Sequence, residues 1–166
     1  DAVPTDIDFI IISNPTSEHH AIIEKCTAFG VPLFIEKPPL MQLDGSEMLL
    51  EKIKAKGIRT YTAFNFRFHP VIKWLNDHLN DKRVLEVQAY CGSYLPHWRP
   101  DRDYRKVYSA VSHLGGGVHL DLIHELDYIT WLFGTPESIQ STRAKISDLE
   151  IETPDVAHYS LKYEAL

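Results

Sequence analysis

The sequence predicts an α/β fold, with the second half of a doubly wound parallel sheet followed by an α+β domain that has a largely antiparallel open sheet. Two observations predict it. Over residues 1–66, short apolar runs alternate with segments of helical spacing. Over residues 67–166 this alternation stops, and period-two segments surround one long apolar helix pattern. We therefore expect two domains, 1–66 and 67–166.

The first domain begins with a predicted strand over residues 7–13, a short β-branched run typical of a strand buried on both faces. Asn14-Pro15 turns the chain into a helix over residues 17–29, in which Ser17 is a possible N-cap. Gly30 ends this helix. Its expected inward side chains have near-helical spacing: Ala21, Ile22, Cys26 and Phe29.

The same pattern then repeats. Residues 31–35 form a second buried strand, residues 44–56 a helix closed by Gly57, and residues 58–64 a third strand. The second helix is expected to bury Met48, Leu49 and Ile53. A β-α-β-α-β order predicts a parallel sheet with right-handed connections.

The second domain is predicted to start with a helix over residues 69–79, with Pro70 in its first turn. Residues 84–94 alternate as in a strand of a sheet covered on one side. A long polar and aromatic loop over residues 93–113 follows, and then a helix over 117–133 that Gly134 ends. Residues 138–146 and 156–163 are expected to be two further strands.

Composition excludes several classes of function. The net charge is −6 with no basic block, which argues against a nucleic-acid partner. No apolar run is long enough to predict a membrane span or a signal peptide. Cys26 and Cys91 lack metal-ligand spacing and fit two buried free thiols, so we expect a cytoplasmic protein.

A lysine follows the second predicted strand, in the sequence Glu36-Lys37-Pro38. Ligands of open α/β sheets bind at the carboxyl ends of the strands. A lysine at such an end can stabilise negative charge on a substrate oxygen or relay a proton. The alternative is a solvated lysine that only caps a strand, and the three residues alone leave both readings open.

A glycine cluster at residues 115–117 precedes a second candidate group, Asp121, His124 and Asp127. In one helix these three would share a face, and histidine is a natural acid/base near neutral pH. Alternatively Asp121 compensates the helix dipole and His124 is a core residue. A metal site of His119, Asp121 and His124 is the least favoured reading, because the glycines better suit close approach of a ligand.

Arginines and aromatic residues gather in the predicted loop, among them Trp98, Arg99 and Tyr104. Arginine binds carboxylate or phosphate and aromatic rings stack on sugars, so a substrate or subunit contact is expected here. A salt-bridged surface loop is the alternative. Asn65 and Arg67 lie at the domain crossover, where clefts form.

These motifs, in this order, resemble the glucose-fructose oxidoreductase/inositol dehydrogenase (Gfo/Idh/MocA) family of NAD(P)-dependent oxidoreductases. The resemblance implies a Rossmann-like dinucleotide-binding domain and a substrate-binding and oligomerisation domain, with NAD or NADP as cofactor. It implies that Lys37 is the catalytic lysine and that Asp121 and His124 bind substrate hydroxyls and exchange a proton. Asn14, Pro15, Glu36 and Lys37 would line the nicotinamide. The small-molecule substrate would be a sugar, amino sugar or cyclitol, and the C-terminal sheet would form a homo-oligomer.

The chain departs from the family pattern in two ways. Two residues separate Asp121 from His124, where the family commonly has three, so the spacing to Asp127 supports His124 better than Asp121. No Gly-x-Gly-x-x-Gly loop or ribose-binding acid is present, so we expect an N-terminally truncated fragment that is inactive alone. The alternatives are a non-catalytic sugar-binding or regulatory member, or an assembly domain.

Overall fold

The computed structural model describes residues 6–79 and 81–164, and the chain divides into two compact units. The first comprises Asp1–Ala63 with His113–Gly115, and the second comprises Phe64–Ser112 with Gly116–Leu166. None of the helices in the described ranges is both long and apolar enough to cross a membrane.

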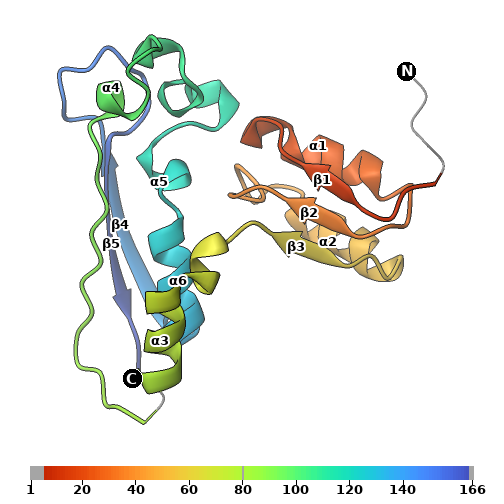
Figure 1. The fold of residues 1–166 in the computed structure, drawn as a ribbon, viewed down its shortest axis with the longest axis horizontal. Helices are drawn as coiled ribbons and strands as arrows, with labels where there is room; N and C mark the ends of the chain where they lie inside the picture. Colours follow the sequence, from red (N-terminus) through yellow and green to blue (C-terminus); the bar gives the residue numbers. More distant parts are fainter. Residues whose placement is uncertain (1–5, 80, 165–166) are drawn as a thin grey trace. The chain divides into compact units, whose positions relative to one another are not determined.

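The first unit has the predicted order of elements and a parallel sheet with strand order β1-β2-β3, which confirms that prediction (Figure 1). Each strand has three hydrogen-bonded residues and is shorter than its apolar run in the sequence. The elements are β1 (Ile10–Ile12), α1 (Thr16–Cys26), β2 (Leu33–Ile35), α2 (Ser46–Ala55) and β3 (Thr60–Thr62).

The sheet of the first unit is covered on one face only. Ile23 of α1 and Leu49 and Ile53 of α2 pack with Ile12 and Leu33 in one core cluster. Because both helices lie on that face, the expectation of strands buried on both faces is wrong. On the other face, three side chains in register remain 60%, 41% and 54% exposed: Ile11, Phe34 and Tyr61.

Helix α1 buries a different stripe from the one that its apolar residues predict. The buried side chains are Thr16, His19 and Ile23, whereas Ala21 and Phe29 are exposed. The helix begins at Thr16 after Pro15, without a side-chain cap, so Ser17 is not its N-cap. Two polar residues thus shift the inward face, and a hydrophobic pattern does not detect them. Similarly, Met48 of α2 is 73% exposed and the expectation that it lies inward is wrong.

The second unit joins short helices to an antiparallel pair of strands, β4 (Ser138–Ala144) and β5 (Val156–Lys162). Helix α3 (Pro70–Leu79) starts at the predicted proline. The predicted 93–113 loop contains short helical turns. The remaining helices are η1 (Asn65–Phe68), α4 (Leu95–Trp98), η2 (Tyr104–Lys106), η3 (Tyr108–Ala110), η4 (Ser112–Leu114), α5 (Val118–Asp121) and α6 (His124–Phe133).

The helix expected over residues 117–133 is broken into α5 and α6. Leu122 leaves the helical region, with φ −101° and ψ 34°, and the second helix begins at His124. The argument that Asp121 and His124 share one helical face therefore fails, because it assumed an unbroken helix. His124 and Asp127 do belong to the same helix.

Residues 84–94 are not a strand, which corrects the second prediction for this unit. They run as an extended segment beside β5 and α6, seen in Figure 1 as the long green trace. A period-two pattern indicates extended backbone, but a strand also needs a hydrogen-bonded neighbour. Leu85 is 82% exposed, so the prediction that one face of this segment is covered is wrong. Both cysteines are free thiols, but Cys91 is exposed, so the prediction that both thiols are buried is also wrong.

Gly116 is required by close packing of backbone against backbone. A Cβ atom at this position would lie 2.3 Å from the carbonyl oxygen of Tyr108 and 2.8 Å from that of Ser109. The sequence predicted that a ligand approaches the glycine cluster closely. At Gly116 the backbone of Tyr108 and Ser109 occupies that space instead. We expect Gly116→Ala to lower the free energy of unfolding by about 2–3 kcal/mol, because backbone must move to admit the methyl group.

Chemical denaturation of the chain measures this loss, and Gly57→Ala is the matched control. Gly57 has φ +64° but nothing within 4 Å of a Cβ atom, so its substitution costs only about 1 kcal/mol of backbone strain. Equal losses for the two variants would contradict the packing argument.

Candidate functional site

Four predicted cofactor residues lie at one edge of the sheet in the first unit. Asn14 and Pro15 follow β1, and Glu36 and Lys37 follow β2. The strands are parallel, so both turns leave the same carboxyl edge. The ladder continues to this edge, where the Glu36 N–H donates to the Ile12 carbonyl oxygen at 2.9 Å.

Lys37 is half-buried at this edge. Its backbone N–H donates to the Glu36 carboxylate at 3.2 Å, and a cis peptide bond joins it to Pro38. Asn14 is exposed and Pro15 is half-buried. The structure thus brings the four residues to two neighbouring turns, as required of groups that line one ligand.

His19 was not among the predicted site residues, yet it connects these two turns. It has no exposed surface, and its ring contacts carbonyl oxygens of both. The sequence signal was only a histidine after Asn-Pro, next to a second histidine with the same chemistry.

In the second unit, the imidazole of His124 lies against two phenylalanine rings. Phe66 stacks on it, with centroids 4.6 Å apart and an interplanar angle of 16°. Phe64 meets it edge-on at 6.4 Å. Aromatic contacts of these kinds fix a ring's orientation. His124 is therefore an oriented side chain rather than a freely rotating one.

Arg67 and Asp127 form a bidentate ion pair next to His124. The Nε and Nη2 atoms of Arg67 donate to the two carboxylate oxygens at 2.9 and 2.5 Å. Asp127 is buried, and the Arg67 guanidinium also lies 5.5 Å from the Phe64 ring centroid. The carboxylate raises the pKa of Arg67, mainly through this hydrogen bond. Residues 64–67 thereby surround the start of α6.

The remaining predicted substrate residues lie elsewhere in this unit or at its surface. Asn65 is exposed at the start of η1, and Trp98 and Arg99 are exposed at the end of α4. Tyr104 is half-buried, and its hydroxyl oxygen accepts a hydrogen bond from the Glu150 N–H.

An ion-pair network occupies part of the aromatic and arginine-rich loop. Arg105 binds Asp103 at 2.8 Å and Glu150 at 3.2 Å, and its neighbour Lys106 lies 3.8 Å from Asp103. For these residues the structure supports the salt-bridged surface alternative. Trp98 and Arg99 are not among the residues that form these three ion pairs.

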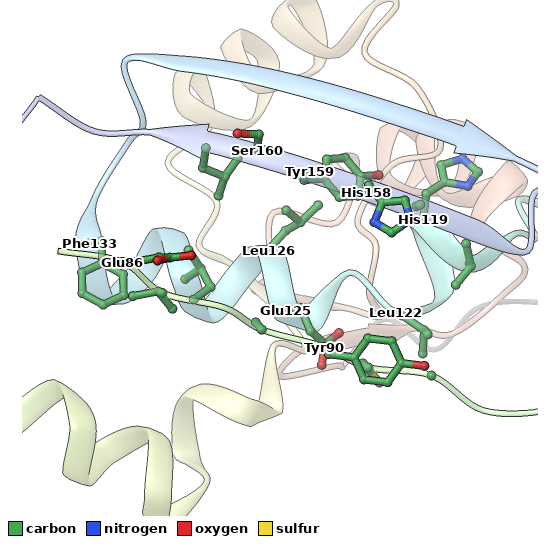
Figure 2. A pocket seen from close by; sticks show the side chains of 18 of the residues that line it. Glu86, Tyr90, His119, Leu122, Glu125, Leu126, Phe133, His158, Tyr159 and Ser160 are labelled. Atoms are coloured by element: carbon green, nitrogen blue, oxygen red, sulfur yellow. The ribbon is translucent and has the colours of Figure 1, made fainter. Parts of the chain in front are cut away.

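A cavity of 1170 Å³ lies within the second unit, between the extended 84–94 segment, α6 and β5 (Figure 2). The labelled side chains in Figure 2 include Glu125 and Leu126 of α6 on one side, with His158 and Tyr159 of β5 on another. None of the predicted site residues lines it.

His119 also lines this cavity, and its Nδ1 atom is buried without a hydrogen-bond partner among the described residues. Burial lowers the pKa of His119, and the positive charge of Arg143 lowers it further. The neutral ring is thus favoured in the folded chain. Protonation favours unfolding, so stability is fully present above about pH 6.5 and falls as the pH decreases below it.

We expect His119→Asn to reduce the dependence of unfolding free energy on pH between roughly pH 7 and pH 5. Asparagine does not titrate, so it removes this one contribution. Denaturation at several pH values measures the pH dependence of the unfolding free energy in both chains, with His158→Asn at an exposed position of β5 as the control. A slope that is unchanged in the His119 variant would contradict the assignment.

Metal binding is not supported by geometry in the described ranges. No group of three or more His, Cys, Asp or Glu side chains within residues 6–79 and 81–164 is arranged to hold a metal ion. The trio His119, Asp121 and His124 is divided by the break between α5 and α6.

Two family models cover nearly the whole chain. Residues 1–64 match the oxidoreductase family with an NAD-binding Rossmann fold, and residues 76–165 match the GFO/IDH/MocA C-terminal domain.

Curated relatives are similar over most of this chain. It is 28% identical over 148 residues to inositol 2-dehydrogenase of Rhizobium meliloti, covering 88% of this chain and 43% of the relative. It is 28% identical over 141 residues to scyllo-inositol 2-dehydrogenase (NAD(+)) of Bacillus subtilis, covering 84% and 39%. The chain thus spans about two-fifths of the length of these relatives.

Solved structures show the same fold. The WlbA dehydrogenase from Bordetella pertussis, in complex with NADH and UDP-GlcNAcA, is 16% identical with a TM-score of 0.77. The match covers 96% of this chain and 49% of that protein. Because the two family models match residues 1–64 and 76–165, the chain belongs to the Gfo/Idh/MocA family of oxidoreductases.

Proposed function

We propose that the whole protein containing this chain is an NAD(P)-dependent oxidoreductase that transfers a hydride between nicotinamide and a sugar, amino-sugar or cyclitol carbon. The observation that carries the proposal is the placement of Lys37 at the carboxyl edge of a parallel sheet in a chain of this family. Open α/β sheets bind their ligands at that edge.

The residues at this edge fit the nicotinamide part of a dinucleotide. Asn14 and Pro15 on one turn, and Glu36 and Lys37 on the next, supply an amide, an apolar ring and two charges at neighbouring strand ends. When bound, NAD or NADP supplies the hydride chemistry. The chain's own residues orient the ligands and handle the proton.

In the proposed reaction, oxidation of a substrate hydroxyl releases one proton from oxygen while the hydride leaves carbon. Lys37 stabilises negative charge that develops on that oxygen. His124 accepts the proton, and returns it in the reverse direction, because imidazole exchanges protons near neutral pH. Asp121 binds a further hydroxyl, and Asn65, Arg67, Trp98, Arg99 and Tyr104 contact the rest of the substrate.

Two further features of the proposal concern assembly and compartment. Six of the seven residues of β4 are exposed, which favours a homo-oligomer through the C-terminal sheet. The two free thiols fit a reducing, cytoplasmic compartment. Analytical ultracentrifugation of the whole protein tests the oligomer.

The chain alone is expected to bind the dinucleotide weakly or not at all, because it contains no Gly-x-Gly-x-x-Gly loop to hold the pyrophosphate. Titration calorimetry of the chain with NAD⁺, NADH, NADP⁺ and NADPH measures this. Tight binding by any of the four would show that the pyrophosphate is held in another way.

The proposed activity is tested on the whole protein with a panel of sugars, amino sugars and cyclitols, by following nicotinamide absorbance with NAD⁺ and with NADP⁺. Reduction of either nucleotide that depends on one substrate supports the proposal. Binding of a sugar and a nucleotide without turnover would favour the alternative, a non-catalytic sugar-binding or regulatory member of the family.

A further inference from the structure

We propose that His19 is a positioning residue that holds Lys37 at the carboxyl edge of the sheet by connecting the turns after β1 and β2. It lies in the first turn of α1, and none of its surface is exposed. The proposed reaction gives it no role. A histidine buried to this extent needs hydrogen-bond partners, and each of its ring nitrogens lies within hydrogen-bond distance of a carbonyl oxygen. The doubly protonated ring donates to both turns, whereas either neutral tautomer donates to one turn and packs against the other.

The two ring nitrogens face different turns. Nδ1 lies 3.0 Å from the carbonyl oxygen of Pro38, and Nε2 lies 3.0 Å from the carbonyl oxygen of Asn14. A second carbonyl, that of Pro39, lies 3.3 Å from Nδ1. The imidazole thus spans the turn that begins at Asn14 and the turn that contains Lys37.

The carbonyl oxygens are the only backbone hydrogen-bonding groups of Pro38 and Pro39. Pro38 and Pro39 have no backbone N–H, so this part of the turn has no donor of its own with which to bind a neighbouring strand. A side chain that donates to their carbonyl oxygens therefore takes over the role of a ladder hydrogen bond. His19 reaches them from α1, which also packs on β1 and β2.

The contact acts directly on Lys37, because Pro38 is the next residue in the chain. Fixing the Pro38 carbonyl restricts the backbone on one side of Lys37, while the Glu36 carboxylate accepts its N–H on the other. The neighbouring His20 does not substitute for His19, since its ring lies near Gly45 instead, with Nε2 3.2 Å from the position of a Cβ atom there.

The effect of His19 on the reaction rests on the proposed function, but its connection of the two turns does not. The connection is therefore tested on the 166-residue chain. We compare His19→Phe, which keeps a ring but has no donor, with Ile53→Ala, which weakens the same core from α2 without removing a hydrogen bond to either turn. The readouts are hydrogen–deuterium exchange over residues 13–20 and 33–41, and the rate of Lys37 acylation relative to exposed Lys54.

In His19→Phe we expect exchange in both segments to be roughly tenfold faster, the change expected for loss of one or two buried hydrogen bonds. The Lys37/Lys54 acylation ratio is expected to change as well. Both readouts should stay near those of the unchanged chain in Ile53→Ala. His19→Gln, which can donate to one of the two turns, should have an intermediate effect. If the phenylalanine variant does not fold, the same two readouts are measured on His19→Gln instead.

The proposal is overturned if the folded His19 variants match the unchanged chain in both readouts, or if Ile53→Ala changes them equally. These outcomes do not depend on turnover. A connection seen in the chain, together with a whole protein that has no oxidoreductase activity, would uphold this inference and reject the proposed function.

Discussion

Replacing Lys37 by methionine, or His124 by asparagine, in the whole protein is expected to lower kcat by a factor of about 10²–10⁴, the range typical of acid–base residues. Methionine preserves much of the length of Lys37 and removes its charge. Asparagine keeps a polar group at His124 and removes the proton exchange. Each loss concerns a group proposed to act on the hydroxyl, so kcat should fall more than nucleotide affinity.

Steady-state kinetics and nucleotide titration of each variant measure the two effects. Lys54→Met in α2 and His158→Asn in β5 change exposed side chains and are the matched controls, and both should keep full activity. Variants of Lys37 and His124 that retain kcat while only KM rises would indicate that these residues bind substrate without taking part in proton transfer.

Removing the guanidinium of Arg67 is expected to destabilise the folded chain as much as Gly116→Ala does. The side chain of Asp127 is only 4% exposed, and Arg67→Ala leaves its carboxylate without the partner that holds both oxygens. We expect unfolding to become easier by about 2–3 kcal/mol. The loss is smaller than for a fully buried pair because Arg67 is 39% exposed and water screens the interaction.

Denaturation of the chain measures this loss, with Lys162→Ala as the control. Lys162 pairs with Glu137 at 2.8 Å, but both side chains are largely exposed, so little should change. The double variant Arg67→Met/Asp127→Leu should recover much of the stability, because it removes both charges together. An Arg67→Ala variant as stable as Lys162→Ala would contradict the account.

The parallel half of the fold was predictable because its signals are local. Short apolar runs, helical spacing and the glycines that end the helices gave the order of five elements and the direction of the strands. The buried face of α1 was not predictable in this way. Thr16 and His19 occupy it as buried polar residues, and the burial of His19 depends on carbonyl groups that lie elsewhere in the chain.

The second unit was harder to predict because its elements depend on distant neighbours. The apolar spacing of residues 117–133 is continuous, yet the helix breaks at Leu122. Residues 84–94 alternate correctly for a strand, but a strand is defined by a hydrogen-bonded partner, which alternation does not specify.

The candidate site shows the same limit. Residue type and position at a strand end select Lys37 as a candidate but leave the solvated-lysine alternative open, and it is the family resemblance that adds Glu36 and Asn14. Arg67 was selected as a substrate ligand by residue type, and the structure gives it a partner 60 residues away in the chain. Whether it also contacts substrate remains a prediction.

The most direct test of the proposed function is to follow deuterium from carbon to nicotinamide. The whole protein is incubated with NAD⁺ or NADP⁺ and carbon-deuterated cyclitols, sugars or amino sugars, and the nucleotide is analysed by mass spectrometry. The account predicts reduced nicotinamide that carries one deuterium per molecule, because the hydride leaves the substrate carbon directly. Bound substrate and nucleotide with no deuterated nicotinamide from any member of the panel would contradict it.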